Sequence, residues 1–122
     1  MKKTMQGIMV LYILLVAFGI VKAEDNYGAI AYSESTGKWG YSYDYGCRRQ
    51  AENAALHRCK SGACEIKVWF KNACGALAKG SGGALGWSWA TSGRREAESV
   101  ALSECRTRGS NCRIICWACT SR

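Results

Sequence analysis

The 122-residue sequence contains no proline, a single histidine (His57) and only nine acidic residues against 17 lysines and arginines. A lone histidine argues against a zinc site and against a histidine general base, because each needs partner residues that no motif here supplies. The only long apolar run covers residues 8–20. The remainder of the chain therefore has no segment that we expect to span a membrane.

The amino-terminal segment has the three parts of an export signal. Residues 1–3 are Met-Lys-Lys, residues 8–20 are apolar, and small residues stand at Val21 and Ala23. The apolar run is shorter than the about 20 residues that a spanning helix needs. We expect residues 1–23 to be a signal peptide and residues 24–122 to form a single domain. That domain is expected to be extracellular, or periplasmic if the source is a Gram-negative bacterium.

The predicted exported domain is basic and rich in cysteine. Residues 1–23 carry three of the 17 basic residues and no acidic one, which leaves a net charge of +5 for the rest. This charge permits attraction to anionic partners without requiring it. All eight cysteines follow residue 23. An even number in a small exported chain indicates a disulfide framework.

The chain contains one unit twice, over about 27–74 and 75–119. Residues 40–43 read Gly-Tyr-Ser-Tyr, and 46 positions later the chain reads Gly-Trp-Ser-Trp. Arg-Arg-Gln-Ala-Glu from residue 48 likewise becomes Arg-Arg-Glu-Ala-Glu from residue 94. A near-constant offset over most of the chain indicates duplication.

Each repeat has the pattern strand, strand, helix, strand. Bulky and small residues alternate over about 39–45 and again over 85–90, as in a strand with two unlike faces. Helices are expected over about 48–59 and 94–106, each with alanines on one face, and third strands over 64–70 and 112–117. The predicted class is α+β: two tandem β-β-α-β repeats, with the helices packed on one face of an antiparallel or mixed sheet and disulfides as staples.

The repeat limits how the cysteines can pair. In each unit one cysteine ends the helix and another begins the following strand, a short turn apart, which predicts Cys59–Cys64 and Cys105–Cys112. Cys47 and Cys116 have no cysteine counterpart in the other repeat. A pair gained together would form Cys47–Cys116 and leave Cys74–Cys119.

Several motifs resemble a known family. They are Tyr-Gly-Ala-Ile-Ala-Tyr-Ser from residue 27, Trp-Gly-Tyr-Ser from 39, Trp-Phe-Lys-Asn-Ala-Cys-Gly-Ala-Leu-Ala from 69 and Gly-Trp-Ser-Trp from 86. The chain resembles, over residues 27–119, the family of small exported, mostly bacterial domains known as domain of unknown function four-one-eight-nine. The resemblance implies no catalytic residues. It implies a common set of six cysteines, from which this chain departs by adding Cys47 and Cys116.

No residue set predicts an enzyme, a metal site or a cofactor. Cys116 and Cys119 form a C-x-x-C string, but too few residues follow for the helix that would activate a thiol. His57 lacks an adjacent nucleophile or partner and is expected at the surface. We therefore expect structural cysteines and a chain that is not an enzyme.

Two features remain as candidate binding elements. The aromatic rows could stack on bases or sugar faces, or they could fill the space beneath the alanine-rich helices, which is the interpretation favoured here. Trp39 and Tyr45, at the strand ends, are the rings most expected to be exposed. Arginines at both helix starts could bind anions, or they could pair with Glu52 and Glu98. These arginines are Arg48, Arg49, Arg94 and Arg95.

The leading hypothesis is an exported, non-catalytic interaction module. Its partner would be a glycan, an anionic membrane surface or a protein, with no sequence-specific recognition of nucleic acid. The alternatives are a secreted defence or toxin-like effector and an inhibitor of a secreted enzyme.

Overall fold

A computed structural model describes residues 25–121 of the chain, and the expected signal peptide lies outside the described residues. The described part consists of two units with the same order of elements. The first contains β1 (Tyr27–Tyr32), β2 (Trp39–Tyr45), α2 (Arg48–Cys59) and β3 (Glu65–Lys71). The second contains β4 (Cys74–Lys79), the 3-10 turn η1 (Ser81–Gly83), β5 (Leu85–Ala90), α3 (Arg94–Arg106) and β6 (Arg113–Cys119).

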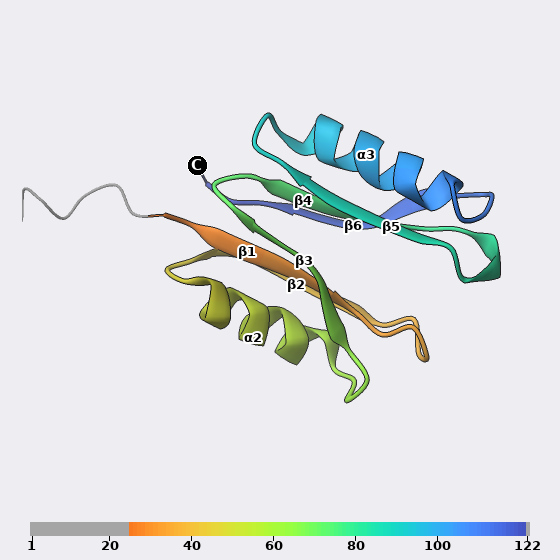
Figure 1. Ribbon diagram of the computed structural model, residues 1–122. Coiled ribbons are helices and arrows are strands. Elements are labelled where there is room, and N and C mark those ends of the chain that lie inside the picture. The colour runs from red at the N-terminus through yellow and green to blue at the C-terminus, as the bar shows by residue number, and fades with distance from the viewer. Residues whose placement is uncertain (1–24, 122) are drawn as a thin grey trace, which may run out of the picture.

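The predicted α+β class is confirmed, but each repeat builds a sheet of its own. The strand orders are β2-β1-β3 and β5-β4-β6, and all neighbours are antiparallel. The two sheets face one another, with β2 against β6 and β3 against β5. Each helix covers the outer face of its own sheet, so the order of layers is α3, sheet, sheet, α2 (Figure 1). No helix within residues 25–121 is long and apolar enough to cross a membrane.

Small residues on the edge strands bring the helices close to the sheets. A Cβ added at Gly40 would lie 2.5 Å from the Ala55 carbonyl oxygen in α2, and one at Gly86 would lie 2.1 Å from that of Ala101 in α3. Two residues further along each strand a serine hydroxyl donates to a helix carbonyl: Ser42 to Ala51 and Ser88 to Ala97, both at 2.6 Å. The Gly-x-Ser motif is therefore the helix-facing side of β2 and β5.

This packing corrects the expected position of the aromatic rows. The alanines of the helices meet small strand residues rather than large rings, and Ala51 and Ala55 are fully buried against Ala29 and Ala31. Since neighbouring residues of a strand point to opposite faces, the aromatic residues of β2 and β5 point away from the helices. The space between the sheets is filled mainly by aliphatic and aromatic side chains of β1, β3 and β4, with Ile30, Phe70 and Leu77 fully buried or nearly so.

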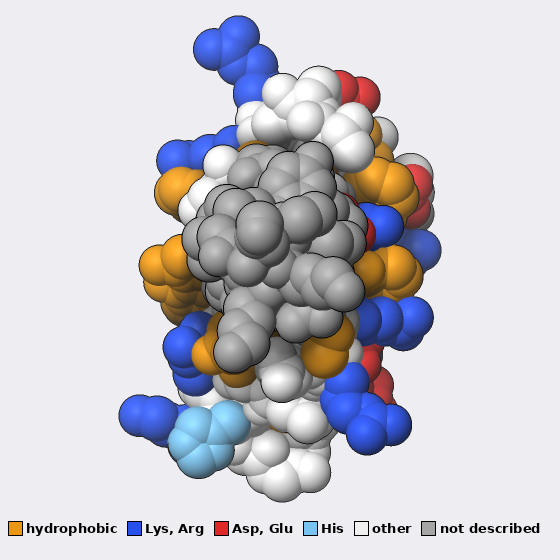
Figure 2. Space-filling model, turned by 90° about the vertical axis from the view of Figure 1, so that its left-hand side faces the viewer, with side chains coloured by type: hydrophobic (Ala, Val, Ile, Leu, Met, Phe, Trp, Pro, Cys, Tyr) orange, Lys and Arg blue, Asp and Glu red, His pale blue; other side chains and the backbone are white. Residues whose placement is uncertain are grey.

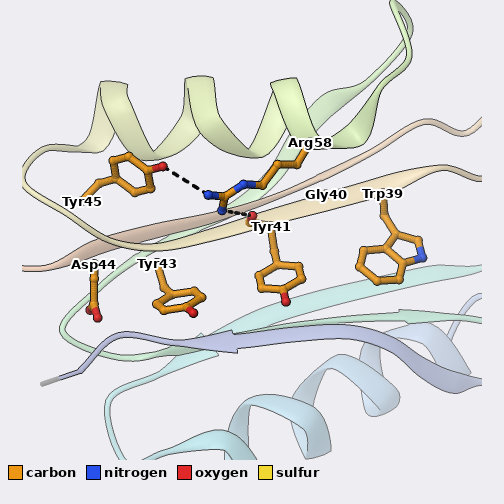
Figure 3. Close-up of a pocket in the computed structure, with 7 residues that line it drawn as sticks. All are labelled: Trp39, Gly40, Tyr41, Tyr43, Asp44, Tyr45 and Arg58. Carbon is orange, nitrogen blue, oxygen red and sulfur yellow. Dashed lines mark hydrogen bonds between the residues drawn. The ribbon is translucent and has the colours of Figure 1, made fainter.

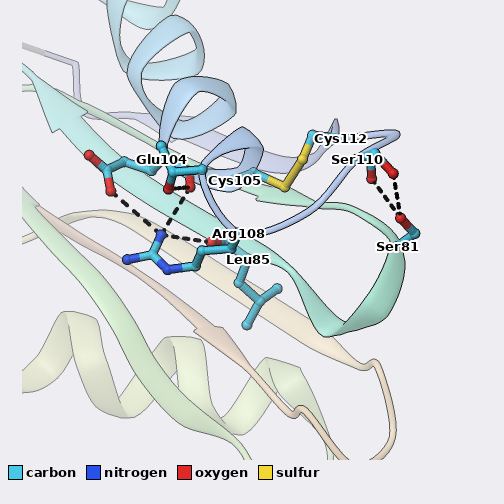
Figure 4. The surroundings of a disulfide bond; sticks show 8 residues. Ser81, Leu85, Glu104, Cys105, Arg108, Ser110 and Cys112 are labelled. Carbon is cyan, nitrogen blue, oxygen red and sulfur yellow. Dashed lines mark hydrogen bonds and ion pairs between the residues drawn. A yellow bond between two sulfur atoms is a disulfide. The ribbon is translucent and has the colours of Figure 1, made fainter.

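Three disulfides join elements of the structure. Cys59–Cys64 and Cys105–Cys112 connect each helix end to the next strand, and Cys74–Cys119 joins the paired strands β4 and β6. Figure 4 shows how the Cys105–Cys112 region is reinforced by Arg108, whose Nη1 donates to the Leu85 carbonyl oxygen of β5 at 3.1 Å. Such bonds tie the helix ends to the edge strands.

The expected Cys47–Cys116 disulfide is wrong. Cys47 is an exposed thiol at the start of α2, outside the first sheet. Cys116 is a buried thiol on β6 and belongs to the cluster between the two sheets. The two side chains lie in different layers of the fold, so the absence of repeat counterparts did not make them partners.

Candidate functional site

Three aromatic side chains form a row along the edge strand β2. The ring centroids of Trp39 and Tyr41 are 6.1 Å apart and those of Tyr41 and Tyr43 are 6.3 Å apart, with interplanar angles of 27° and 13°. All three rings are accessible, with 40%, 37% and 49% of the residue surface exposed. We call these three residues the β2 ladder. Exposed, nearly parallel rings at regular spacing offer flat faces to a ligand.

The ladder stands between two surface depressions. One, on the helix side, is also lined by Tyr45 and Arg58. The other is lined by residues 115–119 of β6. Figure 3 shows Trp39, Tyr41 and Tyr43 extending from β2 away from α2, with Tyr45 and Arg58 on the α2 side of the strand. A ligand lying along β2 could therefore contact the rings and the helix-side groups together.

A bulge near the end of β2 ends the alternation that the sequence predicted through Tyr45. Ala29 pairs with Ser42 but Tyr27 pairs with Tyr45, so β2 has one more residue than β1 in this interval. Asp44 takes up the difference with a positive φ of 64°, a conformation that aspartate tolerates better than most residues. Its carboxylate accepts hydrogen bonds from the backbone N–H and the hydroxyl of Ser121, which holds the end of the described chain beside the ladder.

Arg58 is the cationic group of this site. Its Nη1 donates to the Tyr41 carbonyl oxygen at 2.9 Å, and its Nη2 donates to the Tyr45 hydroxyl at 3.4 Å. Within residues 25–121 no carboxylate lies within ion-pair distance of this guanidinium; Asp44, which lines the same depression, is hydrogen-bonded to Ser121 instead. Sequence reasoning missed Arg58, because Glu104 occupies the equivalent position of the second repeat and the duplication gave no signal.

The ladder also presents polar groups that have no partner in the described chain. The indole N–H of Trp39 and the hydroxyls of Tyr41 and Tyr43 form no hydrogen bond within residues 25–121. An indole offers one donor, and a phenol can both donate and accept. The row therefore combines ring faces with groups able to bond hydroxyls.

The arginines at the helix starts do not line either depression beside the ladder and are divided between two environments. Arg48 and Arg94 form i,i+4 ion pairs with Glu52 and Glu98, each at 2.8 Å. Their guanidinium carbons also lie 4.3 Å and 3.7 Å from the ring centroids of Trp69 and Trp117. Arg49 and Arg95 are exposed and have no ion-pair partner among residues 25–121. The geometry thus favours the ion-pair interpretation for Arg48 and Arg94.

The residues considered for catalysis are not brought together. His57 is exposed near the end of α2. Cys119 is bonded to Cys74, so the C-x-x-C string does not form a dithiol. Burial raises the pKa of Cys116, the other cysteine of this string, to about 12, which keeps the thiol protonated and unreactive at neutral pH. No group of three potential ligands within residues 25–121 could hold a metal ion.

The fold and the site define a class: a small α+β domain with an internal duplication, disulfide cross-links and exposed aromatic rows. The three disulfides fit an oxidising compartment. The family described as "Domain of unknown function (DUF4189)" matches residues 27–119, and the chain belongs to this family.

Similar proteins are found in mycobacteria. The chain is 48% identical over 56 residues to Protein Rv1269c of Mycobacterium tuberculosis and to Protein Mb1300c of Mycobacterium bovis. These matches cover 46% of this chain and 44% of each relative, so the chain spans less than half the length of the curated relatives it matches. Among solved structures, the NMR structure of Rv1813c from Mycobacterium tuberculosis is similar, with 33% identity and a TM-score of 0.58. That match covers 81% of this chain and 78% of the other.

Proposed function

We propose that the domain is an exported, non-catalytic module that binds an acidic polysaccharide along the β2 ladder. The observation that carries the proposal is the row of Trp39, Tyr41 and Tyr43, three exposed and nearly parallel rings with unused polar groups. Pyranose rings present C–H groups on their faces and hydroxyls at their edges. The C–H faces pack on the negative faces of aromatic rings, and the hydroxyls bond to the phenol and indole groups.

Charge complementarity favours an acidic chain over a neutral one. The Arg58 guanidinium lies beside the ladder without a carboxylate partner in the described chain. A uronate group of a sugar would supply that partner and form charge-assisted hydrogen bonds. A basic domain also attracts a polyanion before contact, an effect that salt weakens.

The direct test is titration calorimetry with two sugars of equal length, hexagalacturonic acid and cellohexaose. We expect tighter binding of the acidic hexamer at low salt. The double variant Tyr41→Ala/Tyr43→Ala should weaken that binding about 30-fold, because each ring contributes about 1 kcal/mol of contact energy. The variant Tyr41→Phe/Tyr43→Phe keeps the rings and should retain most of the affinity.

The charge is tested with two arginines of the same helix. Arg58→Gln should remove the preference for the acidic sugar, whereas Arg49→Gln, an exposed arginine at the other end of α2, should leave it in place. Circular dichroism would confirm that both variants are folded.

Two results would overturn the proposal. One is equal affinity of the unaltered protein and the Tyr41→Ala/Tyr43→Ala variant for hexagalacturonic acid. The other is ladder-dependent binding of a thymidine dodecamer that is tighter than binding of either sugar, which would make the row a stacking platform for single-stranded nucleic acid instead.

A further inference from the structure

The second repeat has an aromatic row of its own on the edge strand β5. Trp87 and Trp89 occupy the positions that Tyr41 and Tyr43 occupy in the first repeat, at an offset of 46 residues. Both are exposed, Trp89 more than any other large hydrophobic residue in the described chain, at 56%. Gly86 and Ser88 face α3 in the same way that Gly40 and Ser42 face α2, so the two tryptophans project towards the opposite sheet, as the ladder does.

The two rows lie at opposite edges of the sandwich. Strand β2 packs against β6, whereas β5 packs against β3, so each row faces the outer strand of the other sheet. Figure 2, in which the molecule is viewed from the left-hand side of Figure 1, shows hydrophobic side chains at the surface on both flanks. One short ligand cannot contact both rows through the packed interior, so the rows are separate surfaces.

The surroundings of the β5 row differ from those of the ladder in charge. The Nζ of Lys67 lies 5.3 Å from the Trp87 ring centroid. This ammonium group is paired with the carboxylates of Glu34 at 2.9 Å and Glu65 at 3.4 Å. Although partial burial lowers the pKa of Lys67, the hydrogen bonds and charges of these two carboxylates outweigh that effect and raise it. Lys67 thus stays charged at neutral pH, and its charge is already compensated.

The β5 row also has fewer rings. The residue that corresponds to Trp39 is Leu85, which is 7% exposed and packs in the core between the sheets. Glu104 stands at the position equivalent to Arg58, and the guanidinium that bonds to this edge strand is that of Arg108. It donates to the Leu85 carbonyl oxygen and lies 3.5 Å from the carboxylate of Glu104. Within residues 25–121, both cations described at this edge, Lys67 and Arg108, therefore have carboxylate partners, whereas Arg58 beside the ladder has none.

We infer that Trp87 and Trp89 form a second polysaccharide site, selective for uncharged sugars, so that one domain can hold two chain segments at once. The inference rests on the proposed function. The indole N–H groups of both tryptophans have no hydrogen-bond partner within residues 25–121 and are free to bond sugar hydroxyls. The ammonium group of Lys67 and its two carboxylates, with a net charge of −1, offer a donor and acceptors without attracting a polyanion. Two sites on one rigid domain raise the effective concentration of a bridging polymer at the second site once the first is occupied.

The test follows the five indole N–H signals of the ¹⁵N-labelled protein by NMR, because the tryptophans report separately on the two sites. Replacing each tryptophan by phenylalanine assigns its signal. Titration with cellohexaose should move the Trp87 and Trp89 signals, and their dissociation constant should be unchanged within twofold in the Tyr41→Ala/Tyr43→Ala variant. Trp117, which lines the depression beside the ladder, reports with Trp39 on binding at that site.

Variants of the β5 row complete the design. Trp87→Ala/Trp89→Ala should lower cellohexaose affinity at least tenfold while leaving hexagalacturonic acid binding at the ladder within twofold. Trp87→Phe/Trp89→Phe, which keeps aromatic faces, should restore most of the cellohexaose affinity and guards against a loss caused by misfolding.

The possible failures are distinguishable. If the Trp39 signal responds to hexagalacturonic acid while Trp87 and Trp89 ignore cellohexaose, the second site is refuted and the proposed function stands. If the Trp87 and Trp89 signals respond only when the ladder is intact, the rows are not independent and the inference also fails. If no indole signal responds to either sugar, both the proposed function and the second site fall.

Discussion

Substituting Gly86 by alanine would test the claim that the Gly-x-Ser motif holds each helix against its sheet. A Cβ at this position would lie 2.1 Å from the Ala101 carbonyl oxygen, 2.4 Å from the Cys105 amide nitrogen and 3.0 Å from the Cys105 Cα. All three atoms belong to the backbone of α3, so no side-chain rotation can relieve the overlap. Ordinary contact begins at 3.4 Å, and the helix would have to move outwards by more than 1 Å.

The cost follows from what that movement breaks. Overpacking of a well-filled interior usually costs about 1–3 kcal/mol. Displacement of α3 would also stretch the 2.6 Å hydrogen bond from Ser88 to Ala97, which contributes about 1 kcal/mol. We therefore expect a loss of about 3 kcal/mol in unfolding free energy, to be measured from the midpoint of guanidinium denaturation with the disulfides intact. For a domain of this size the melting temperature should fall by about 15 °C.

Gly46→Ala is the matched control. Nothing lies within 4 Å of a Cβ built at Gly46, and its φ is not positive. That variant should be neutral, or slightly stabilising because alanine restricts the unfolded chain. If Gly86→Ala and Gly46→Ala had unfolding free energies within 0.5 kcal/mol of each other, the close helix–strand packing would be refuted.

Three further outcomes are expected. Replacing Cys74 and Cys119 by serine should lower the unfolding free energy by about 4 kcal/mol in a urea titration, because that disulfide has a sequence separation of 45. Replacing Cys59 and Cys64, with a separation of 5, should lower it by about 2 kcal/mol. Equal losses would contradict the loop-length argument. Iodoacetamide at pH 8 should modify Cys47 alone in the native protein, since Cys116 is buried and its pKa is about 12. Mass spectrometry should count two labels after unfolding without reductant, and four labels would mean that a disulfide is absent. Ser42→Ala should cost about 1 kcal/mol in thermal unfolding by leaving the Ala51 carbonyl without that donor, and no change would show that the bond contributes nothing net.

The positions of the elements could be predicted from the sequence because the duplication supplies two independent copies of each local pattern. The expected helices over 48–59 and 94–106 agree with α2 and α3. The first two disulfides could also be predicted, since a helix end and the next strand start are close in any arrangement of such units. What failed was non-local: the pattern within a repeat does not say whether two repeats share a sheet or stack two sheets face to face.

The aromatic rows show why the alternation of bulky and small residues does not predict which face of a strand packs on the helix. A period of two identifies two faces of a strand, but it does not assign either face to the helix. The alanine-rich helix was expected to need large partners, whereas Gly40 and Ser42 supply small ones and let the backbones approach. The Cys47–Cys116 prediction failed for a related reason. The absence of a counterpart in the other repeat does not say in which layer a cysteine lies, and Cys116 lies on a strand face that points between the sheets.

Helix packing and the proposed binding are thus divided between the two faces of the same strands. Because Gly40 and Gly86 must face the helices, the rings at alternate positions are directed to the other side, where the edge strands meet only the outer strand of the opposite sheet and leave the rings partly exposed. Duplication of such a unit therefore gives each copy its own aromatic row. The helix-facing residues of β2 and β5 cannot vary without moving a helix, but the rings can. The exchange of Tyr41 and Tyr43 for Trp87 and Trp89 between the repeats is such a variation, and it allows two rows of common origin to differ in ligand without loss of the fold.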